Sequence, residues 1–276
     1  MRTRFAPTPS GRLHLGNAAH ALLTSWWAQS QGGTVLLRVD DVDAPRCDPR
    51  YRQDIVEVLT WLGIQVDPWP GDAQGEQRSR LKRIEASRAA LTAAMVRGLP
   101  VYACQCSRRV LSAQLPYGIP TGGCPSGCRQ ADHELVAGES ALRVAVPPDT
   151  VVNVDGRAVN VHEELGDFVI WRRDDLPAYQ WFSVVDDTDA GITHILRGED
   201  LHTSSAAQLF LARFLPDNSL LDVEFRHHAL VMGDAGLKLS KSQSAQTTTL
   251  PRDASTRDLV VAWATELGQP LGIHQP

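Results

Sequence analysis

The sequence predicts an α/β fold with a parallel sheet, because strand-like and helix-like segments alternate in the first part of the chain. These segments are a strand at Arg2–Phe5, a helix at Asn17–Gln31, a strand at Thr34–Val39 and a helix at about Arg50–Leu62. Strands joined through helices in this order favour parallel pairing. A chain of 276 residues with 43% hydrophobic content is long for one core. We therefore expect two domains, or one domain with a large insertion.

The chain changes character at Gly98 and returns to longer apolar segments after about Asp175. Before this stretch, Gln77–Arg97 carries an apolar stripe at helical spacing. Within it, Gly, Pro and Cys are frequent and the β-like stretches ALRVAV and TVVNVDG are short, which indicates an insertion with its own small core. The elements expected later are strands at FSVVDD and ITHILRGED and helices at Ser204–Leu215 and about Leu259–Leu267. We expect residues 1–98 and 176–245 to form two halves of one α/β domain, 99–175 its insertion and 246–276 a short tail.

The composition excludes some classes of protein. Charged residues make up 21% of the chain and the net charge is −5, which argues against non-specific coating of nucleic acid. No apolar run approaches the ~20 residues needed to span a bilayer. The N-terminus also lacks the apolar stretch of a signal peptide. We expect a cytoplasmic globular protein with no membrane association.

The connection between the first strand and the first helix is longer than a plain connection needs to be. It runs over eleven residues, from Ala6 to Gly16, where a few would suffice. Its end, Arg12-Leu13-His14-Leu15-Gly16-Asn17, lies at a helix N-terminus, where free N–H groups and the helix dipole favour an anion. Gly16 lets a phosphate approach the backbone, and His14 and Asn17 add side-chain donors. Two interpretations of these residues alone are equally good. One is an anion site, and the other is an N-capped helix that carries a solvent-exposed histidine.

A second stretch, late in the chain, carries two lysines beside a serine. Gly236-Leu237-Lys238-Leu239-Ser240-Lys241-Ser242 can bring mobile positive charge onto a polyphosphate. Taken alone, it is better explained as a solvated loop. The sequence contains neither a GxGxxG fingerprint nor a Walker A sequence, so those nucleotide-binding motifs are excluded.

Together, HxGN after the first strand and KLSKS late in the chain resemble the paired nucleotide signature of class I aminoacyl-tRNA synthetases. RFAPTPSGRLHLGN is similar to the glutamyl and glutaminyl branch in particular, as are LLRVDDVDAPR (Leu36–Arg46), the region of Tyr179 and ILRGED (Ile195–Asp200). The resemblance runs from Arg2 to Ser242, with the motifs in the family's order. It implies the Rossmann-like parallel sheet of a class I synthetase, and an enzyme that activates L-glutamate with ATP and Mg²⁺.

The resemblance also implies which residues bind ATP. His14, Gly16 and Asn17 would hold the phosphates, and Lys238 would add charge beside them. Lys241 would stabilise the transition state and the leaving pyrophosphate. His14, Asn17 and Lys241 are therefore the implied catalytic residues.

Glutamate presents two carboxylates and an ammonium group. Arg4 and Arg197 match family positions that meet the carboxylates, a task that suits planar guanidinium groups. Tyr179 matches a residue that hydrogen-bonds the substrate, and Asp40 stands where relatives carry Glu as the ammonium acceptor. The implied glutamate-binding residues are Arg4, Ala6, Thr8, Asp40, Tyr179 and Arg197.

Four of the five cysteines cluster in the expected insertion. Cys104 and Cys106 form C-x-C, and seventeen residues later Cys124 and Cys128 form C-x3-C. Without an export signal, disulfides are disfavoured and a metal is indicated, although reduced buried thiols are an alternative. The resemblance implies one structural zinc here, since four thiolates suit a closed tetrahedral site. Cys124 departs from relatives that carry Tyr as the third ligand.

The distance from the KLSKS stretch to the last residue separates two groups of this family. Only 34 residues follow Ser242, whereas an anticodon-binding domain needs at least ~50. The resemblance is therefore to the truncated group, which attaches glutamate to the queuosine base in the anticodon of tRNA(Asp). Its implied partners are ATP, L-glutamate and queuosine-containing tRNA(Asp), and we expect a monomer. Candidate contacts to the stem phosphates are Arg108, Arg109, Arg172 and Arg173.

Three alternatives remain open at this point. A shortened glutamyl-tRNA synthetase would charge a tRNA 3′ end. A non-catalytic tRNA-binding paralogue would tolerate loss of His14 or Lys241, and both residues are present. A small-molecule adenylyltransferase would share HxGN, but the glutamate-type motifs and the cysteine cluster argue against it.

Overall fold

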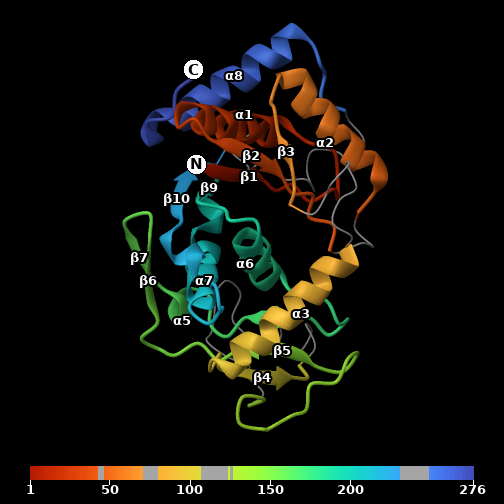
Figure 1. Cartoon of the computed structure of the whole chain (residues 1–276), viewed down its shortest axis with the longest axis vertical. Coiled ribbons are helices and arrows are strands. Elements are labelled where there is room, and N and C mark those ends of the chain that lie inside the picture. Colours follow the sequence, from red (N-terminus) through yellow and green to blue (C-terminus); the bar gives the residue numbers. More distant parts are fainter. Residues whose placement is uncertain (43–46, 71–79, 107–123, 125–126, 231–248) are drawn as a thin grey trace. The chain divides into compact units, whose positions relative to one another are not determined.

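The structure, a computed structural model, describes residues 1–42, 47–70, 80–106, 124, 127–230 and 249–276 of the chain. It contains two compact units (Figure 1). The first comprises Met1–Arg78, Ile192–Asp200 and Val223–Pro276, and the second comprises Ser79–Gly191 and Leu201–Asp222. In the part of the chain that the structure describes, no helix is both long and apolar enough to cross a membrane.

Parallel strands run through the first unit. They are β1 (Arg2–Phe5), β2 (Thr34–Leu37), β3 (Asp67–Pro68), β9 (His194–Gly198) and β10 (Glu224–His228). Strand β2 pairs with both β1 and β3, and β9 pairs with β10, each pair in parallel. The segment leading into β9 lies beside β1, because the Thr193 N–H donates to the Arg2 carbonyl at 2.9 Å. The predicted α/β class with parallel strands is therefore confirmed.

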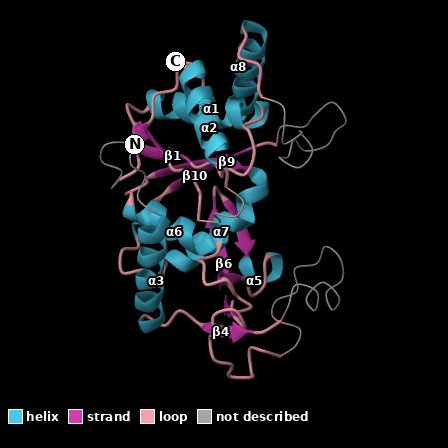
Figure 2. Cartoon of the chain, turned by 90° about the vertical axis from the view of Figure 1, so that its right-hand side faces the viewer, coloured by secondary structure: helices cyan, strands magenta, loops and turns pink. Residues whose placement is uncertain are grey.

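Three helices of the first unit share one apolar core (Figure 2). They are α1 (Leu15–Ser30), α2 (Pro49–Leu62) and α8 (Ala254–Gly268). Their buried side chains include Leu23, Trp26 and Trp27 of α1, Ile55, Val58 and Leu59 of α2, and Val260, Ala264 and Leu267 of α8. Burial of these apolar side chains is the main driving force for packing the helices. The predicted C-terminal helix Leu259–Leu267 is correct in kind and starts one turn late.

Helix ends in this unit follow local capping chemistry. The Asp48 side chain accepts the Arg50 N–H at 2.8 Å, and Pro49 occupies the first helical position of α2. Gly63 ends this helix with φ 72°, a left-handed conformation that glycine adopts without steric cost. Helix α1 starts at Leu15, before the predicted Asn17, because His14 caps it.

The second unit combines helices with two antiparallel sheets. Its helices are α3 (Arg80–Val96), α5 (Val161–Glu164), α6 (Tyr179–Asp189) and α7 (His202–Ala212). One sheet has the order β4 (Val101–Cys104), β5 (Ala141–Val144), β8 (Val169–Trp171), and the other is the hairpin β6 (Val151–Val154)–β7 (Arg157–Asn160). Asp155 and Gly156 both have positive φ, as the tight turn of a two-residue hairpin requires. The predicted β-like stretches ALRVAV and TVVNVDG are confirmed.

One predicted strand is wrong. FSVVDD lies inside helix α6, although its Val and Phe residues favour strands. The helix buries Trp181, Phe182, Val184 and Val185, and packs between α3 and α7. Tertiary packing therefore overrides the local propensity, which is a weak determinant for short apolar runs.

The compact units and the predicted segments divide the chain at different places. Helix α3 falls within segment 1–98 and helices α6 and α7 within 176–245, yet all three pack in the same unit as the insertion strands. The roles assigned to the segments 1–98, 99–175, 176–245 and 246–276 stay predictions.

A buried ion pair joins α3 to α6 in the second unit. Arg83 Nε donates to Asp186 Oδ2 at 3.1 Å, and both side chains are almost fully buried. The Arg83 guanidinium also lies 5.8 Å from the centre of the Phe182 ring. Breaking a buried pair leaves a desolvated charge behind, which costs far more than losing an exposed pair.

We predict that Arg83→Met lowers the free energy of unfolding by about 3–5 kcal/mol. The double variant Arg83→Met/Asp186→Leu should recover most of this loss, because it removes the stranded carboxylate. Arg88→Met, on the same helix and in an exposed pair with Asp175, should cost about 1 kcal/mol or less. Urea denaturation followed by circular dichroism measures all three, and equal losses for Arg83→Met and Arg88→Met would contradict the prediction.

Candidate active site and metal centre

Backbone hydrogen bonds hold the long connection between β1 and α1. The Arg38 N–H donates to Phe5 C=O at 2.9 Å, and the Asp40 N–H donates to Pro7 C=O at 3.0 Å. Further along, the Asp48 N–H donates to Pro9 C=O at 3.0 Å. The connection therefore continues the pairing of β1 beyond the sheet. Ala6 and Thr8, two predicted glutamate-binding residues, lie in this held stretch.

His14 occupies the N-cap position of α1. Its Nδ1 accepts the Asn17 backbone N–H at 3.3 Å. An accepting Nδ1 carries no proton, so the neutral imidazole has its proton on Nε2, where it is a donor. Gly16 and Asn17 lie in the first turn of the helix. The structure therefore shows the capping role of His14, and anion binding at this helix end stays a prediction.

Two arginines predicted to meet glutamate are buried in the first unit. Arg4 on β1 is 5% exposed and Arg197 on β9 is 4% exposed. The Arg197 guanidinium lies 5.4 Å from the centre of the Phe225 ring. Both arginine charges act on the same neighbour, His20 of α1. The structure therefore brings Arg4 and Arg197 to one region beside α1.

His20 and His228 form a hydrogen-bonded pair in this region. His228 Nδ1 lies 2.7 Å from Ala229 C=O, which can only accept, so this nitrogen carries the proton. Burial lowers the pKa of His228, and burial together with the charges of His228, Arg4 and Arg197 lowers the pKa of His20 well below its usual value. Neutral His228 then accepts from His20 at 3.0 Å, between Nε2 and Nδ1. The two histidines are therefore neutral at neutral pH, and Arg4 and Arg197 are the cations beside them.

Asp40 is held by its neighbour Arg38. Arg38 Nε donates to Asp40 Oδ1 at 2.7 Å and Nη2 donates to Oδ2 at 3.3 Å, and both side chains are nearly fully buried. The Arg38 guanidinium also lies 5.5 Å from the centre of the Trp69 ring. This arrangement keeps Asp40 in one orientation beside the held connection.

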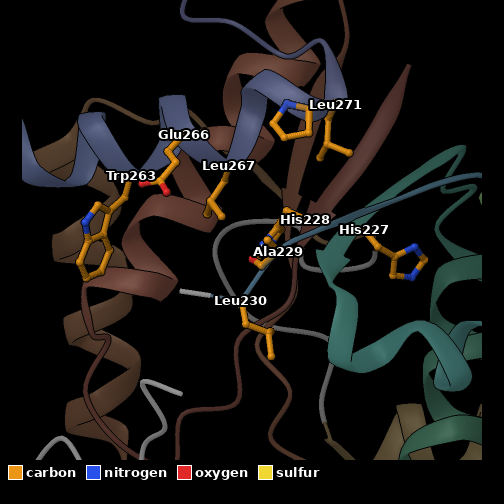
Figure 3. A pocket seen from close by; sticks show the side chains of 9 residues that line it. His227, His228, Ala229, Leu230, Trp263, Glu266, Leu267 and Leu271 are labelled. Carbon is orange, nitrogen blue, oxygen red and sulfur yellow. Dashed lines mark hydrogen bonds between the residues drawn. The ribbon is translucent and has the colours of Figure 1, made fainter. Parts of the chain in front are cut away.

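A cavity of about 430 Å³ opens at the carboxyl end of β10. Its walls come from the end of β10 and from α8 with the turn after it (Figure 3). Figure 3 shows Trp263, Glu266 and Leu267 extending from α8 towards His228 and Ala229. Ligands of open parallel sheets bind beyond the carboxyl ends of the strands, and this cavity lies at such an end. His228 links it to His20.

The other predicted residues belong to the second unit or lie outside the described residues. Tyr179 is the first residue of α6 in the second unit, is 38% exposed and makes an edge contact with Phe182. Lys238 and Lys241 lie outside the described residues, as do Arg108 and Arg109. Arg172 pairs with Asp174. Arg173 donates to the Gln105 carbonyl at 2.8 Å, which supports the chain around the cysteine cluster.

The four predicted cysteines come together in the second unit. The sulfur atoms of Cys104, Cys106, Cys124 and Cys128 all lie within 4.8 Å of one another. Cys106 Sγ is 3.0 Å from Cys124 Sγ and 3.7 Å from Cys128 Sγ. Tetrahedral zinc with ~2.3 Å bonds separates its sulfur ligands by ~3.8 Å, so small shifts would complete the geometry. The cluster can hold one metal ion, and reduced thiols alone do not explain why two separated C-x-C and C-x3-C pairs converge.

Sequence reasoning missed His20, His228 and Asp54. His20 and His228 are 208 positions apart, so no local pattern connects them. Asp54 reads as an ordinary polar residue of an amphipathic helix, yet its carboxylate accepts the Leu13 N–H at 3.0 Å. Only the packing of α1, α2 and β10 reveals these contacts.

The parallel strands, the capped helix after β1 and the four-cysteine cluster define the catalytic fold of a class I synthetase. The family model "tRNA synthetases class I (E and Q), catalytic domain" matches residues 1–262. A solved glutamate–tRNA synthetase of Elizabethkingia anophelis is similar in fold, with a TM-score of 0.69 and 23% identity over 88% of this chain. This chain spans only 52% of that protein, about half its length.

Two curated relatives are more similar in sequence. A glutamyl-Q tRNA(Asp) synthetase of Burkholderia cenocepacia is 38% identical over 91% of this chain and 83% of its own length. One of Cupriavidus metallidurans is 34% identical over 97% of this chain and 90% of its own length. The chain therefore belongs to the class I tRNA synthetase family for E and Q, among the ligases called glutamyl-Q tRNA(Asp) synthetases.

We predict that the purified protein retains about one divalent metal ion per chain, since four thiolates form a closed site. Cys128→Ser should lose most of this metal and lower the melting temperature of the second unit, because metal binding contributes to folding. Cys47→Ser is the matched control, because Cys47 lies outside the cluster. Elemental analysis and thermal unfolding give the readouts, and equal metal content in both variants would refute the assignment.

Proposed function

We propose that the chain activates L-glutamate with ATP and transfers the glutamyl group to the queuosine base in the anticodon of tRNA(Asp). In the first step, a glutamate α-carboxylate oxygen attacks the α-phosphorus of ATP and pyrophosphate leaves, giving glutamyl-adenylate. In the second, a hydroxyl of queuosine's cyclopentene-diol attacks the acyl carbon, loses its proton, and AMP leaves. The names of the relatives at 38% and 34% identity support this acceptor. We propose a cytoplasmic monomer.

The observation that carries the proposal is the pair of buried arginines on adjacent strands. Arg4 and Arg197 both lie close enough to His20 to act on its charge state. Two guanidinium groups match the two carboxylates of glutamate, and charge-assisted bidentate bonds favour this dicarboxylate over amino acids with a neutral side chain. The neutral His20–His228 pair adds no charge of its own beside these arginines. Tyr179 is a proposed further hydrogen-bond donor to the substrate.

The phosphates of ATP are proposed to bind at the N-terminus of α1. His14 Nε2–H is the proposed donor there, and the helix dipole adds partial positive charge. Asn17, Lys238 and Lys241 complete the proposed set, with Lys241 on the leaving pyrophosphate. Mg²⁺ bound with ATP would neutralise charge on the phosphates. The protein's share is alignment of two anions and electrostatic stabilisation, with no covalent step on its own residues.

The metal cluster is proposed to hold Zn²⁺ in a structural role. Arg173 donates to the carbonyls of Gln105 and Cys106, so the cluster and the β8–α6 connection brace each other. This part of the second unit is a proposed docking surface for the anticodon stem. Arg108, Arg109, Arg172 and Arg173 are its proposed phosphate contacts, because affinity for nucleic acid depends on basic side chains at the backbone.

If Asp40 accepts the substrate ammonium, Asp40→Asn should raise KM for glutamate by ~10–100-fold and KM for ATP far less, the scale of a lost bond to a charged group. Asp40→Glu should be tolerated, because it keeps the charge. Steady-state ATP–pyrophosphate exchange measures both constants, with Asp41→Asn as the neighbouring control. An equal rise in both KM values would point instead to the buried Arg38–Asp40 pair as a structural support.

The acceptor is tested with a queuosine-containing anticodon stem-loop of tRNA(Asp) that has no acceptor stem. We expect glutamate-dependent ATP–pyrophosphate exchange without tRNA, followed by incorporation of radiolabelled glutamate into this fragment. The matched control is the same stem-loop with guanosine in place of queuosine, which lacks the nucleophile. Failure to label the stem-loop, with glutamate appearing at the 3′ end of tRNA(Glu), would overturn the proposal in favour of a shortened glutamyl-tRNA synthetase.

A further inference from the structure

One buried carboxylate in the first unit binds two segments that are remote in sequence. Asp54 lies in the second turn of α2, and its side chain is 1% exposed. Its Oδ2 accepts the Leu13 backbone N–H at 3.0 Å. Its Oδ1 accepts from Arg12 Nη1 and from Arg252 Nη2, each at 3.3 Å. A buried carboxylate is costly unless it is paired, and here both oxygens are used.

The bond to Leu13 bears directly on His14. Leu13 precedes the N-cap, and its own side chain is 2% exposed in the helical core. His14 is therefore held from both sides, by Asp54 through the Leu13 N–H and by its own cap bond to the Asn17 N–H. Fixing the peptide before the cap restricts the backbone torsions that aim the imidazole. This acts on the residue proposed to meet the phosphates.

Arg252 brings the other remote segment to the same carboxylate. It precedes Asp253, the N-cap of α8, and also donates to Glu57 Oε2 at 2.7 Å. Glu57 stands three positions after Asp54, so α2 holds Arg252 with two carboxylates. Hydrogen bonds from Gln53 and then Arg252 lower the pKa of Glu57, so the group is charged at neutral pH. Arg12, Arg252, Asp54 and Glu57 together carry no net charge, as partly buried clusters require.

We infer that Asp54 is a positioning residue for ATP use: it locks the peptide before His14 and ties it through Arg252 to the start of α8. The inference rests on the proposed function, because it assumes that His14 meets the phosphates of ATP. Asp54 contacts no glutamate-binding candidate in the described residues. Substitution of Asp54 should therefore impair the use of ATP and leave glutamate binding nearly unchanged. A displacement of about 1 Å at a catalytic group can cost ~10²-fold in rate.

The test compares Asp54→Asn with Val56→Ala, an exposed residue on the same helix. Asparagine keeps the shape and an acceptor for the Leu13 N–H but loses the charge that holds both arginines. We expect kcat/KM for ATP in exchange to fall by ~10–10²-fold, while KM for glutamate changes by about twofold or less. Val56→Ala should match the wild type. Equal weakening of both substrates, or no change in either, would overturn the inference.

Two further measurements keep the result interpretable. If Asp54→Asn unfolds, Arg252→Gln replaces it, because Arg252 is about one-third exposed and its loss leaves the Leu13 bond in place. It should weaken ATP in calorimetric binding while glutamate binding is retained, and unchanged ATP affinity would overturn the inference. If the proposed function is wrong, the wild-type protein shows no glutamate-dependent ATP–pyrophosphate exchange. The inference about Asp54 is still tested in that case, because calorimetry compares the ATP affinities of the wild type and Arg252→Gln.

Discussion

The arrangement of charged groups in the first unit depends on the hydrogen bonds that hold the connection between β1 and α1. This connection has no secondary structure of its own, so its backbone groups need partners from elsewhere. Residues 38, 40 and 48 supply N–H donors to its carbonyls, and Asp54 accepts its last N–H before the cap. Because its carbonyls and its last N–H are hydrogen-bonded, the connection holds the backbone before His14 in one conformation. An anion at that helix end then meets a prearranged set of donors.

The electrostatics of the same region follow from burial. Arg4 and Arg197 are buried cations, and a histidine packed among them would add charge if it were protonated. Burial and the arginines together keep His20 neutral, and the Ala229 carbonyl selects the tautomer of its partner His228. The region therefore holds two buried guanidinium groups beside a neutral histidine pair. Guanidinium groups bind carboxylates through charge-assisted bidentate hydrogen bonds, which is why a dicarboxylate is the proposed substrate.

The second unit is organised by different interactions. The buried pair of Arg83 and Asp186 joins α3 to α6, and four cysteine thiols converge at the end of β4 and in the chain that follows. The second unit also buries apolar side chains, among them Ile170, Trp181 and Leu211, and its cysteine cluster can hold a metal ion. The contacts of Arg173 with the carbonyls beside Cys106 connect these features locally. In this unit, polar contacts and the cysteine cluster therefore add to apolar packing, while the helices of the first unit share a continuous apolar core.

The sequence by itself determined the elements that local chemistry specifies. Strand Arg2–Phe5, the helices around His14, Asp48 and Asp253 and the four clustered cysteines follow from apolar periodicity, capping residues and cysteine spacing. The family motifs predict His14, Arg4 and Arg197 as members of one site, and this assignment stays a prediction. Tertiary structure decided what depends on distant packing. FSVVDD became helix α6 because α3 and α7 bury it, and β10 formed beside β9. His20 met His228, and Asp54 met Leu13 and Arg252, through contacts spanning 41 to 208 positions, and no pattern within a local window encodes such contacts.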